Sequence, residues 1–293
     1  MPAAVPVPAR TLLLTAVAML AFAANSLLCR LALQHGSIDP ASFGTVRLVS
    51  GALVLALIVR LRSGPAAVAR NDWLAATMLW AYVAGFSFAY LSLSAGTGAL
   101  ILFGAVQLTM FSVGLWRGER FTAMAWCGLA LAVAGLVVLV APGVAAPPLH
   151  GAALMAGAGM AWGVYTLRGR SAGEPVAATA GNFMRAAPMA LALSLVFAGQ
   201  MQASPSGLAL AIASGAITSG LGYVVWYAAL PQLTALRAAT VQLSVPLLAA
   251  AGGVLLLAEA VSLRLLLASA ATLGGIALVL FSRSLAARPR PGA

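Results

Sequence analysis

Ten apolar runs, most of them close to 20 residues long, follow one another along the chain with short joints between them. A helix needs about 20 predominantly apolar residues to cross the hydrocarbon core of a bilayer. We therefore predict an all-α membrane protein with ten transmembrane helices. The runs cover residues 11–30, 42–60, 73–93, 98–116, 122–140, 151–168, 177–198, 208–229, 237–257 and 264–282.

The composition supports a membrane environment and argues against a soluble protein. Hydrophobic residues make up 62% of the chain and charged residues 7%, whereas a soluble domain carries about 25% charged residues. The net charge of +11 could suggest a nucleic-acid partner. The basic residues are all arginines, however, and they stand singly or in pairs between the apolar runs. The expected partner is the lipid bilayer, and no nucleic acid is expected.

The distribution of arginine between the joints predicts the orientation. If the N-terminus is cytoplasmic, twelve arginines fall on the cytoplasmic side, and Arg30 and Arg264 fall on the opposite side. Cytoplasmic loops of membrane proteins carry an excess of basic residues. Both termini are therefore expected in the cytoplasm, which requires an even number of spans. The short loops and the all-arginine basic complement favour a bacterial inner-membrane location.

An internal repeat relates the two halves at an offset of about 140 residues. The segment from Ala21 to Arg30 aligns with Ala161 to Arg170, and Glu119 aligns with Glu259. Each half holds five runs, so the second half enters the membrane in the reverse orientation. Inverted repeats of this kind provide two near-equivalent packings and a basis for alternating access in transporters. The predicted units are residues 1–145 and 146–293.

The repeat also resembles a known family. The five-span repeat, the Arg-Gly-Glu-Arg sequence at 117–120, its partner at 258–259 and the spans with Gly135 and Gly275 resemble two EamA-type repeats of the drug/metabolite transporter superfamily. The stretch from Cys29 to Leu53 is similar to the YddG-type exporters of aromatic amino acids. The resemblance implies ten helices, export of small metabolites and a central cavity lined by helices one, three, four, six, eight and nine.

Polar and aromatic side chains within the spans are the candidates for a substrate pathway. Aromatic residues recur at helical spacing in the third and eighth spans, and the first and sixth spans carry further ones at positions related by the repeat. Such walls offer stacking surfaces and hydroxyl partners to an aromatic substrate, although ordinary packing would use the same residues. The candidate set is Phe22, Asn25, Tyr82, Phe86, Tyr90, Gln107, Trp162, Tyr165, Tyr223, Trp226, Tyr227 and Gln242.

Four charged residues are candidates for structural or gating roles. Arg47 and Arg185 lie inside spans, where each could reach the headgroups, hold the helices of its repeat together or attract a substrate carboxylate. Glu119 and Glu259 each precede a span, where a carboxylate complements the positive end of a helix. A capping role is the favoured interpretation for these two, and gating is the alternative.

The sequence predicts a transporter or exporter of small metabolites, with aromatic and neutral amino acids as the expected substrates. The alternatives are a carrier of drugs, other metabolites or nucleotide sugars, and a membrane bundle that transports nothing. We find no paired carboxylates or histidine cluster of the kind that catalysis or metal binding needs, so no enzyme activity, metal or cofactor is expected. The spans also lack carboxylates near their middle, which favours movement of the substrate down its own gradient over coupling to protons or sodium. The sequence is compatible with a monomer.

Overall fold

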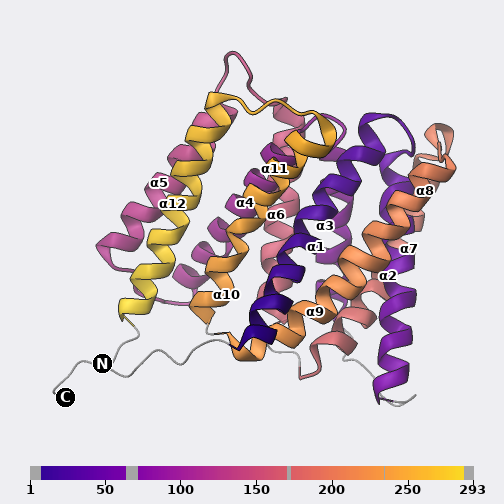
Figure 1. Cartoon of the computed structure of the whole chain (residues 1–293), viewed down its shortest axis with the longest axis horizontal. Helices are drawn as coiled ribbons and strands as arrows, with labels where there is room; N and C mark the ends of the chain where they lie inside the picture. The colour runs from indigo at the N-terminus through magenta and orange to yellow at the C-terminus, as the bar shows by residue number, and fades with distance from the viewer. Residues whose placement is uncertain (1–7, 64–71, 170–172, 234, 287–293) are drawn as a thin grey trace.

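The fold is helical throughout the part of the chain that the computed structural model describes, which comprises residues 8–63, 72–169, 173–233 and 235–286. An isolated antiparallel bridge joins Ile38 to Ala203. Figure 1 shows the long helices running side by side between two ends of the molecule.

The helices match the predicted apolar runs closely. In the first half they are α1 (Ala9–Gln34), α2 (Pro40–Ser63), α3 (Trp73–Ala89), α4 (Ala95–Trp116) and α5 (Ala123–Val140). The second half contains α6 (Leu149–Gly169), α7 (Pro175–Val196), α8 (Pro205–Ile212), α9 (Gly222–Ala229), α10 (Ala235–Gln242), α11 (Ser244–Leu257) and α12 (Leu263–Ala286). Short 3-10 turns lie at Ala198–Gln200 and Leu230–Gln232, and a π-helix, η2 (Ala213–Leu221), connects α8 to α9.

Two predicted spans are not uniform α-helices. The run 208–229 changes from α to π geometry at Ala213 and returns to α geometry at Gly222. The run 237–257 is divided between α10 and α11 at Leu243, three residues before Pro246. Proline lacks an amide hydrogen and displaces the carbonyl four residues earlier, so an interruption at this place is the expected consequence.

Seven helical stretches in the described residues are long and apolar enough to cross a membrane. They include α1, α2, α4, α5 and α12, together with the stretches Pro205–Gln232 and Arg237–Leu257. The apolar helix α3 is shorter, at 17 residues. Helices α6 and α7 have 21 and 22 residues but carry many small and polar side chains, because much of their surface packs on other helices. The number of long apolar helices thus indicates a multi-pass membrane protein.

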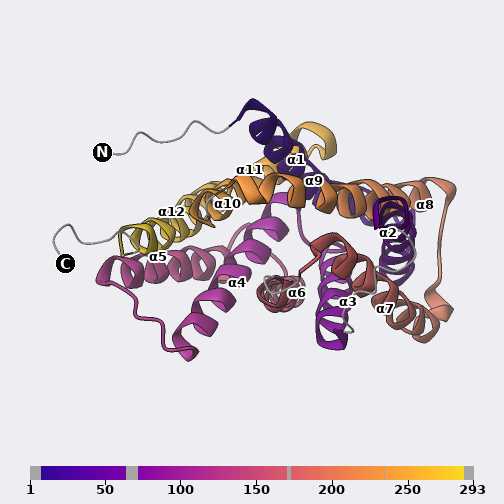
Figure 2. The same cartoon turned by 90° about the horizontal axis from the view of Figure 1, so that it is seen from below.

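The helices form two layers, which Figure 2 shows end on. One layer consists, in order, of α12, α10–α11, α1 and α8–α9, with α2 at its edge. The other layer consists of α5, α4, α6, α3 and α7. Each layer therefore combines helices from both halves of the chain.

The pair α5 and α12 lies at one edge of the molecule, and the two helices are in close contact (Figure 1). A Cβ atom at Gly128 would lie 2.6 Å from the Gly275 carbonyl oxygen, and one at Gly135 would lie 2.7 Å from the Thr272 amide nitrogen. Small residues allow helix backbones to approach closely in membranes, where van der Waals packing drives association. Glycine at these positions sets the distance between the two helices.

Helix α12 begins at a side-chain cap, and its removal provides a first test of the fold. The Ser262 hydroxyl accepts a hydrogen bond from the Leu265 amide at 3.1 Å. Replacing Ser262 by alanine is expected to lower the free energy of unfolding by about 1 kcal/mol, because the amide loses its partner. The melting temperature of the purified protein measures the effect. Ser269→Ala, inside the same helix, is the control, and equal melting of the two variants would contradict the capping role.

Candidate functional site

Arg47 of α2 is fully enclosed between the two halves of the chain, with 1% of its surface exposed. Its Nε donates a hydrogen bond to the Ser219 hydroxyl at 3.2 Å, and its Nη2 donates one to the Tyr82 hydroxyl at 3.1 Å. The guanidinium carbon lies 5.1 Å from the ring centroids of both Tyr82 and Phe86. A cation over an aromatic ring away from water gains about 2 kcal/mol. These contacts exclude the headgroup-reaching alternative for Arg47 in this conformation.

Asn25 of α1 extends the same polar network. Its Nδ2 donates to the Tyr82 hydroxyl at 3.4 Å, while its Oδ1 accepts hydrogen bonds from Ser214 at 2.6 Å and Thr218 at 3.3 Å. The network therefore joins α1, α2 and α3 of the first half to the π-helix of the second. Buried polar groups that find partners in this way hold helices in a fixed arrangement.

The π-helix η2 is placed against α2 by a glycine. A Cβ atom at Gly215 would collide with the Arg47 carbonyl oxygen and the Ser50 hydroxyl, so any larger residue would push the two helices apart. The π-helix also presents Ser214, Thr218 and Ser219 to the polar network on one side. Wide helical turns of this type occur often at functional sites.

The nine aromatic residues predicted for the pathway lie in one continuous cluster. Tyr82 and Trp162 have ring centroids 4.8 Å apart, and Trp162 lies 5.7 Å from Tyr223. Successive rings are separated by no more than 6.4 Å, within the range of favourable aromatic pairs. The cluster consists of Phe22, Tyr82, Phe86, Tyr90, Trp162, Tyr165, Tyr223, Trp226 and Tyr227. We call this set the aromatic cluster.

The aromatic cluster borders the Arg47 guanidinium and extends to half-buried positions. Tyr82 and Phe86 contact Arg47 directly, whereas Phe22, Trp162 and Tyr227 are half-buried. The rings come from α1, α3, α6 and α9, and so from both halves of the chain. Chemically, the arrangement combines one cation, several hydroxyl and amide groups and flat apolar walls. It is suited to a small ligand with an anionic group and an apolar or aromatic body.

A second polar cluster closes the end of the bundle at which α11 joins α12, the upper end in Figure 1. The Glu259 carboxylate accepts from Arg30 Nε at 3.0 Å and from the Ala95 amide at 2.8 Å. Arg30 Nη1 also donates to the Tyr90 carbonyl oxygen at 2.9 Å. Glu259 was expected to cap the helix that follows it, but it caps α4, because Ala258 adopts a left-handed conformation with φ of 53° that turns the chain back. We call Arg30, Tyr90, Ala95 and Glu259 the end clamp.

The other four predicted residues lie outside the helices that carry the aromatic cluster. Gln107 of α4 borders a small hollow of about 20 Å³ that also involves α5 and α12. Gln242 donates a hydrogen bond to the Ala238 carbonyl oxygen of its own helix at 3.1 Å. Arg185 is half-buried on α7, in contrast to its sequence counterpart Arg47, and Glu119 is exposed. The repeat in sequence therefore does not place these charges in equal environments.

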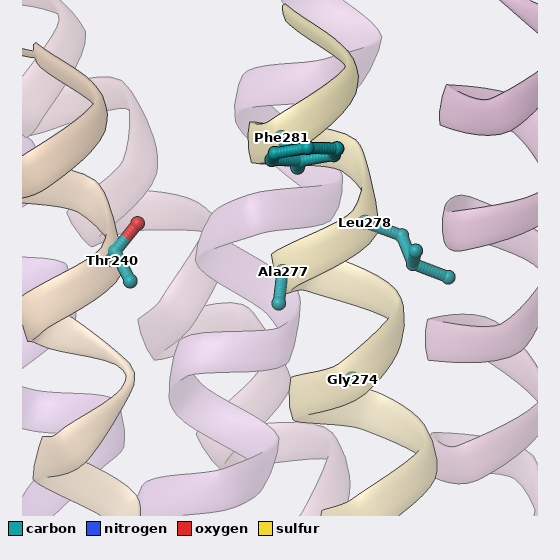
Figure 3. A pocket seen from close by; sticks show the side chains of 5 residues that line it. All are labelled: Thr240, Gly274, Ala277, Leu278 and Phe281. Carbon is teal, nitrogen blue, oxygen red and sulfur yellow. The ribbon is translucent and has the colours of Figure 1, made fainter. Parts of the chain in front are cut away.

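A larger hollow of about 370 Å³ lies between α10 and α12. Figure 3 shows it lined by Thr240 on one side and by Gly274, Ala277, Leu278 and Phe281 on the other. The lining is apolar apart from the Thr240 hydroxyl, and it includes none of the predicted pathway residues. Among the described residues, no group of three histidine, cysteine or acidic side chains lies close enough to hold a metal ion.

The opposite end of the bundle carries an exposed ion pair between the halves. Arg168 Nε lies 2.8 Å from Asp72 Oδ2, and the Ala75 amide donates to Asp72 Oδ1 at 2.9 Å. Partial burial opposes ionisation, but the hydrogen bonds from Arg168 and Ala75 prevail and lower the pKa of Asp72 below its ordinary value. The carboxylate caps α3, which positions Tyr82 and Phe86.

Sequence reasoning did not identify the polar partners that the π-helix supplies. The four-residue spacing of Ser214 and Thr218 is equally typical of small residues that allow close helix packing, so it does not mark them as members of a polar network. Ser219 gave no signal of its own, because its contact with Arg47 depends on the wider π turn. Arg30 was assigned to membrane-flanking charge, and its pairing with Glu259 spans 229 residues of sequence.

Comparison with known proteins identifies the type of protein. Residues 149–281 match the EamA-like transporter family. An uncharacterised protein of Pseudomonas aeruginosa is 57% identical over 274 residues, which cover 94% of this chain and 96% of that protein. A solved crystal structure aligns with 95% of this chain and 99% of its own at a TM-score of 0.66 and 20% identity, a likeness of fold. The chain therefore belongs to one family with the Pseudomonas aeruginosa protein, and it is a multi-pass membrane protein whose residues 149–281 are similar to the EamA-like transporter family.

Proposed function

We propose that the chain exports aromatic and neutral amino acids across the bacterial inner membrane by alternating access between two inverted repeats, residues 1–145 and 146–293. The observation that carries the proposal is the aromatic cluster around Arg47 and Asn25. It lies where helices of both halves meet, and it offers a cation, polar groups and aromatic walls to one small ligand.

The arrangement of helices supports the inverted repeat. The repeat pairs each span of the first half with the span five positions later in the chain. Under this pairing, the helices of one layer correspond in order to those of the other: α12, α10–α11, α1, α8–α9 and α2 correspond to α5, α4, α6, α3 and α7. The contact between α3 and α6 corresponds to the contact between α1 and α8–α9. In the contacting pairs α5–α12, α2–α7 and α4–α11, the two helices are each other's counterparts. This is the pattern expected of a pseudo-two-fold axis between the halves.

Individual contacts follow the same pairing at an offset of 140 residues. A Cβ atom at Gly135 would meet the Ala268 carbonyl oxygen at 2.9 Å, and one at Gly275 would meet that of Gly128. The Thr272 amide lies next to Gly135, and the Ala132 amide lies next to Gly275 in the same way. The N-caps of α5 and α12, Thr122 and Ser262, are also 140 residues apart.

The proposed topology has ten spans and cytoplasmic termini. Helices α3, α6 and α7 would cross the membrane beside the seven more apolar stretches, since they lie in the same layer as α4 and α5 (Figure 2). The excess of arginine in the joints on one side supports the orientation. Under this orientation, the end clamp faces away from the cytoplasm.

Uptake of labelled phenylalanine, tryptophan, threonine and a cationic drug into proteoliposomes tests the function. Saturable flux of the aromatic amino acids is expected. Tyr82→Ala and Trp162→Ala should each reduce the efficiency of that flux about tenfold, because each removes a ring from the aromatic cluster. Trp116→Ala is the matched control, since Trp116 is 88% exposed on α4 and lies outside the cluster.

The outcomes separate the alternatives. Flux of the drug without flux of amino acids would favour a broad drug or metabolite carrier and discard the amino-acid assignment. Flux of none of the four compounds would contradict the proposed substrates and leave the fold unchanged. Equal losses in Trp162→Ala and Trp116→Ala would show that the aromatic cluster is not the pathway.

A further inference from the structure

We propose that the guanidinium of Arg47 is the binding site for the carboxylate of the transported ligand, an inference that rests on the proposed function. The ligand class is a small carboxylate with an aromatic or apolar body. The inference names the group that selects the substrate, whereas the aromatic cluster alone would accept any flat apolar molecule.

The first observation is that the charge of Arg47 has no acidic partner among the described residues. The ion pairs there are Arg30–Glu259 and Arg168–Asp72, and neither involves Arg47. The titratable side chains that act on it are Tyr82, Tyr223 and Cys29, and none of these is an aspartate or a glutamate. A buried charge in a membrane protein normally has a counter-charge, and ionisable groups inside spans mark ligand pathways.

The second observation is that one nitrogen of the guanidinium, Nη1, makes no hydrogen bond in the described part of the chain. Nε and Nη2 donate to Ser219 and Tyr82, whereas Nη1 is buried. Buried polar atoms of native proteins usually have partners, and an exception calls for an explanation. A carboxylate oxygen at Nη1 would supply both the missing acceptor and the missing negative charge.

The third observation concerns the surroundings of the guanidinium. The ring centroids of Tyr82 and Phe86 both lie 5.1 Å from the guanidinium carbon, and the tilted ring of Trp162 lies 4.8 Å from that of Tyr82. A ligand whose carboxylate is bound at Arg47 would therefore place its apolar body among these rings. Trp162 and Phe22 are half-buried, so the approach to Arg47 lies along the half-buried edge of the aromatic cluster and requires the rings to move.

The competing interpretation is that Arg47 is a purely structural tie between α2, α3 and the π-helix. A structural tie would affect every ligand equally when it is removed, since the whole site would loosen. A carboxylate site affects only ligands that carry a carboxylate. Paired ligands that differ in this one group therefore separate the two roles.

The experiment measures equilibrium binding of L-phenylalanine, phenethylamine and 3-phenylpropionate to the full-length protein in detergent. Phenethylamine lacks the carboxylate, and 3-phenylpropionate lacks the amine. In the unmodified protein, phenylalanine and 3-phenylpropionate are expected to bind on the order of tenfold or more tightly than phenethylamine. In Arg47→Gln, phenylalanine should fall to the level of phenethylamine, whose own binding stays unchanged.

Arg60→Gln is the matched control, because Arg60 is an exposed arginine in the last turn of the same helix, so the same charge is removed outside the polar network. It should retain the preference for carboxylates. The preference of the unmodified protein tests the need for a carboxylate even if Arg47→Gln fails to fold. Equal binding of phenylalanine and phenethylamine to the unmodified protein, or equal losses for both in Arg47→Gln, would overturn the Arg47 assignment alone. Binding of none of the three ligands would contradict the proposed function and the Arg47 assignment together.

Discussion

Gly275→Ala is expected to destabilise the protein by about 1–3 kcal/mol, although alanine is the better helix former. The added Cβ atom would collide with the Gly128 carbonyl oxygen and lie 2.5 Å from the Ala132 amide nitrogen. Both obstacles are backbone atoms of α5, so neither can move aside as a flexible side chain could. Helices α5 and α12 must then separate along their whole contact.

Gly274 provides a matched control one residue away on the same helix. An added Cβ atom at Gly274 meets no described atom within 4 Å, because the residue faces the hollow between α10 and α12 (Figure 3). Gly274→Ala should therefore leave the melting temperature unchanged or raise it slightly, through the higher helix propensity of alanine. Thermal melting of the two purified variants measures the difference. Equal melting temperatures would show that the α5–α12 contact is looser than described.

Glu259→Gln is expected to open the end of the bundle that the end clamp closes. The substitution leaves an acceptor for the Ala95 amide but removes the charge that pairs with Arg30. Hydrogen bonds to charged groups contribute about 1.5–3 kcal/mol, and 1.4 kcal/mol corresponds to a tenfold change in population. The pair is 13–19% exposed, so we expect the lower part of this range.

Cys29 is a native reporter for this opening. It precedes Arg30 on α1 and is 0% exposed, whereas Cys127 is exposed and is removed by Cys127→Ala. The rate of maleimide labelling at Cys29 should rise about tenfold in Glu259→Gln, in proportion to the open population. Glu174→Gln is the control, because Glu174 is exposed and accepts no capping hydrogen bond. An unchanged labelling rate in Glu259→Gln would refute the clamp.

Arg30→Gln gives an independent check on the same contact. If Arg30 and Glu259 act through each other, the double variant should label no faster than either single variant. Additive increases would mean that the two residues act separately.

The helices and the aromatic candidates followed from the sequence because they depend on local patterns. Runs of apolar residues near the length of a membrane span fix where helices form, and proline marked the interruption near Pro246. The offset of 140 residues pairs Gly135 with Gly275 from the sequence alone. Helical spacing and the repeat selected nine aromatic residues, and the fold brings all nine together. The polar candidates Gln107 and Gln242 lie on other helices, α4 and α10.

Tertiary structure decided which side chains meet, because hydrogen bonds and ion pairs between distant segments produce no periodic pattern in the sequence. Arg47 and Arg185 occupy related positions in the sequence, yet Arg47 is enclosed by Tyr82, Phe86 and Ser219 and Arg185 is half-buried. The π geometry at Ala213–Leu221 and the left-handed Ala258 redirect polar groups by a fraction of a turn. The sequence by itself determined where apolar helices form and which residues were candidates. Packing between the halves determined the charged site, because Ser219 is 172 residues from Arg47 in the chain and meets it only in the folded structure.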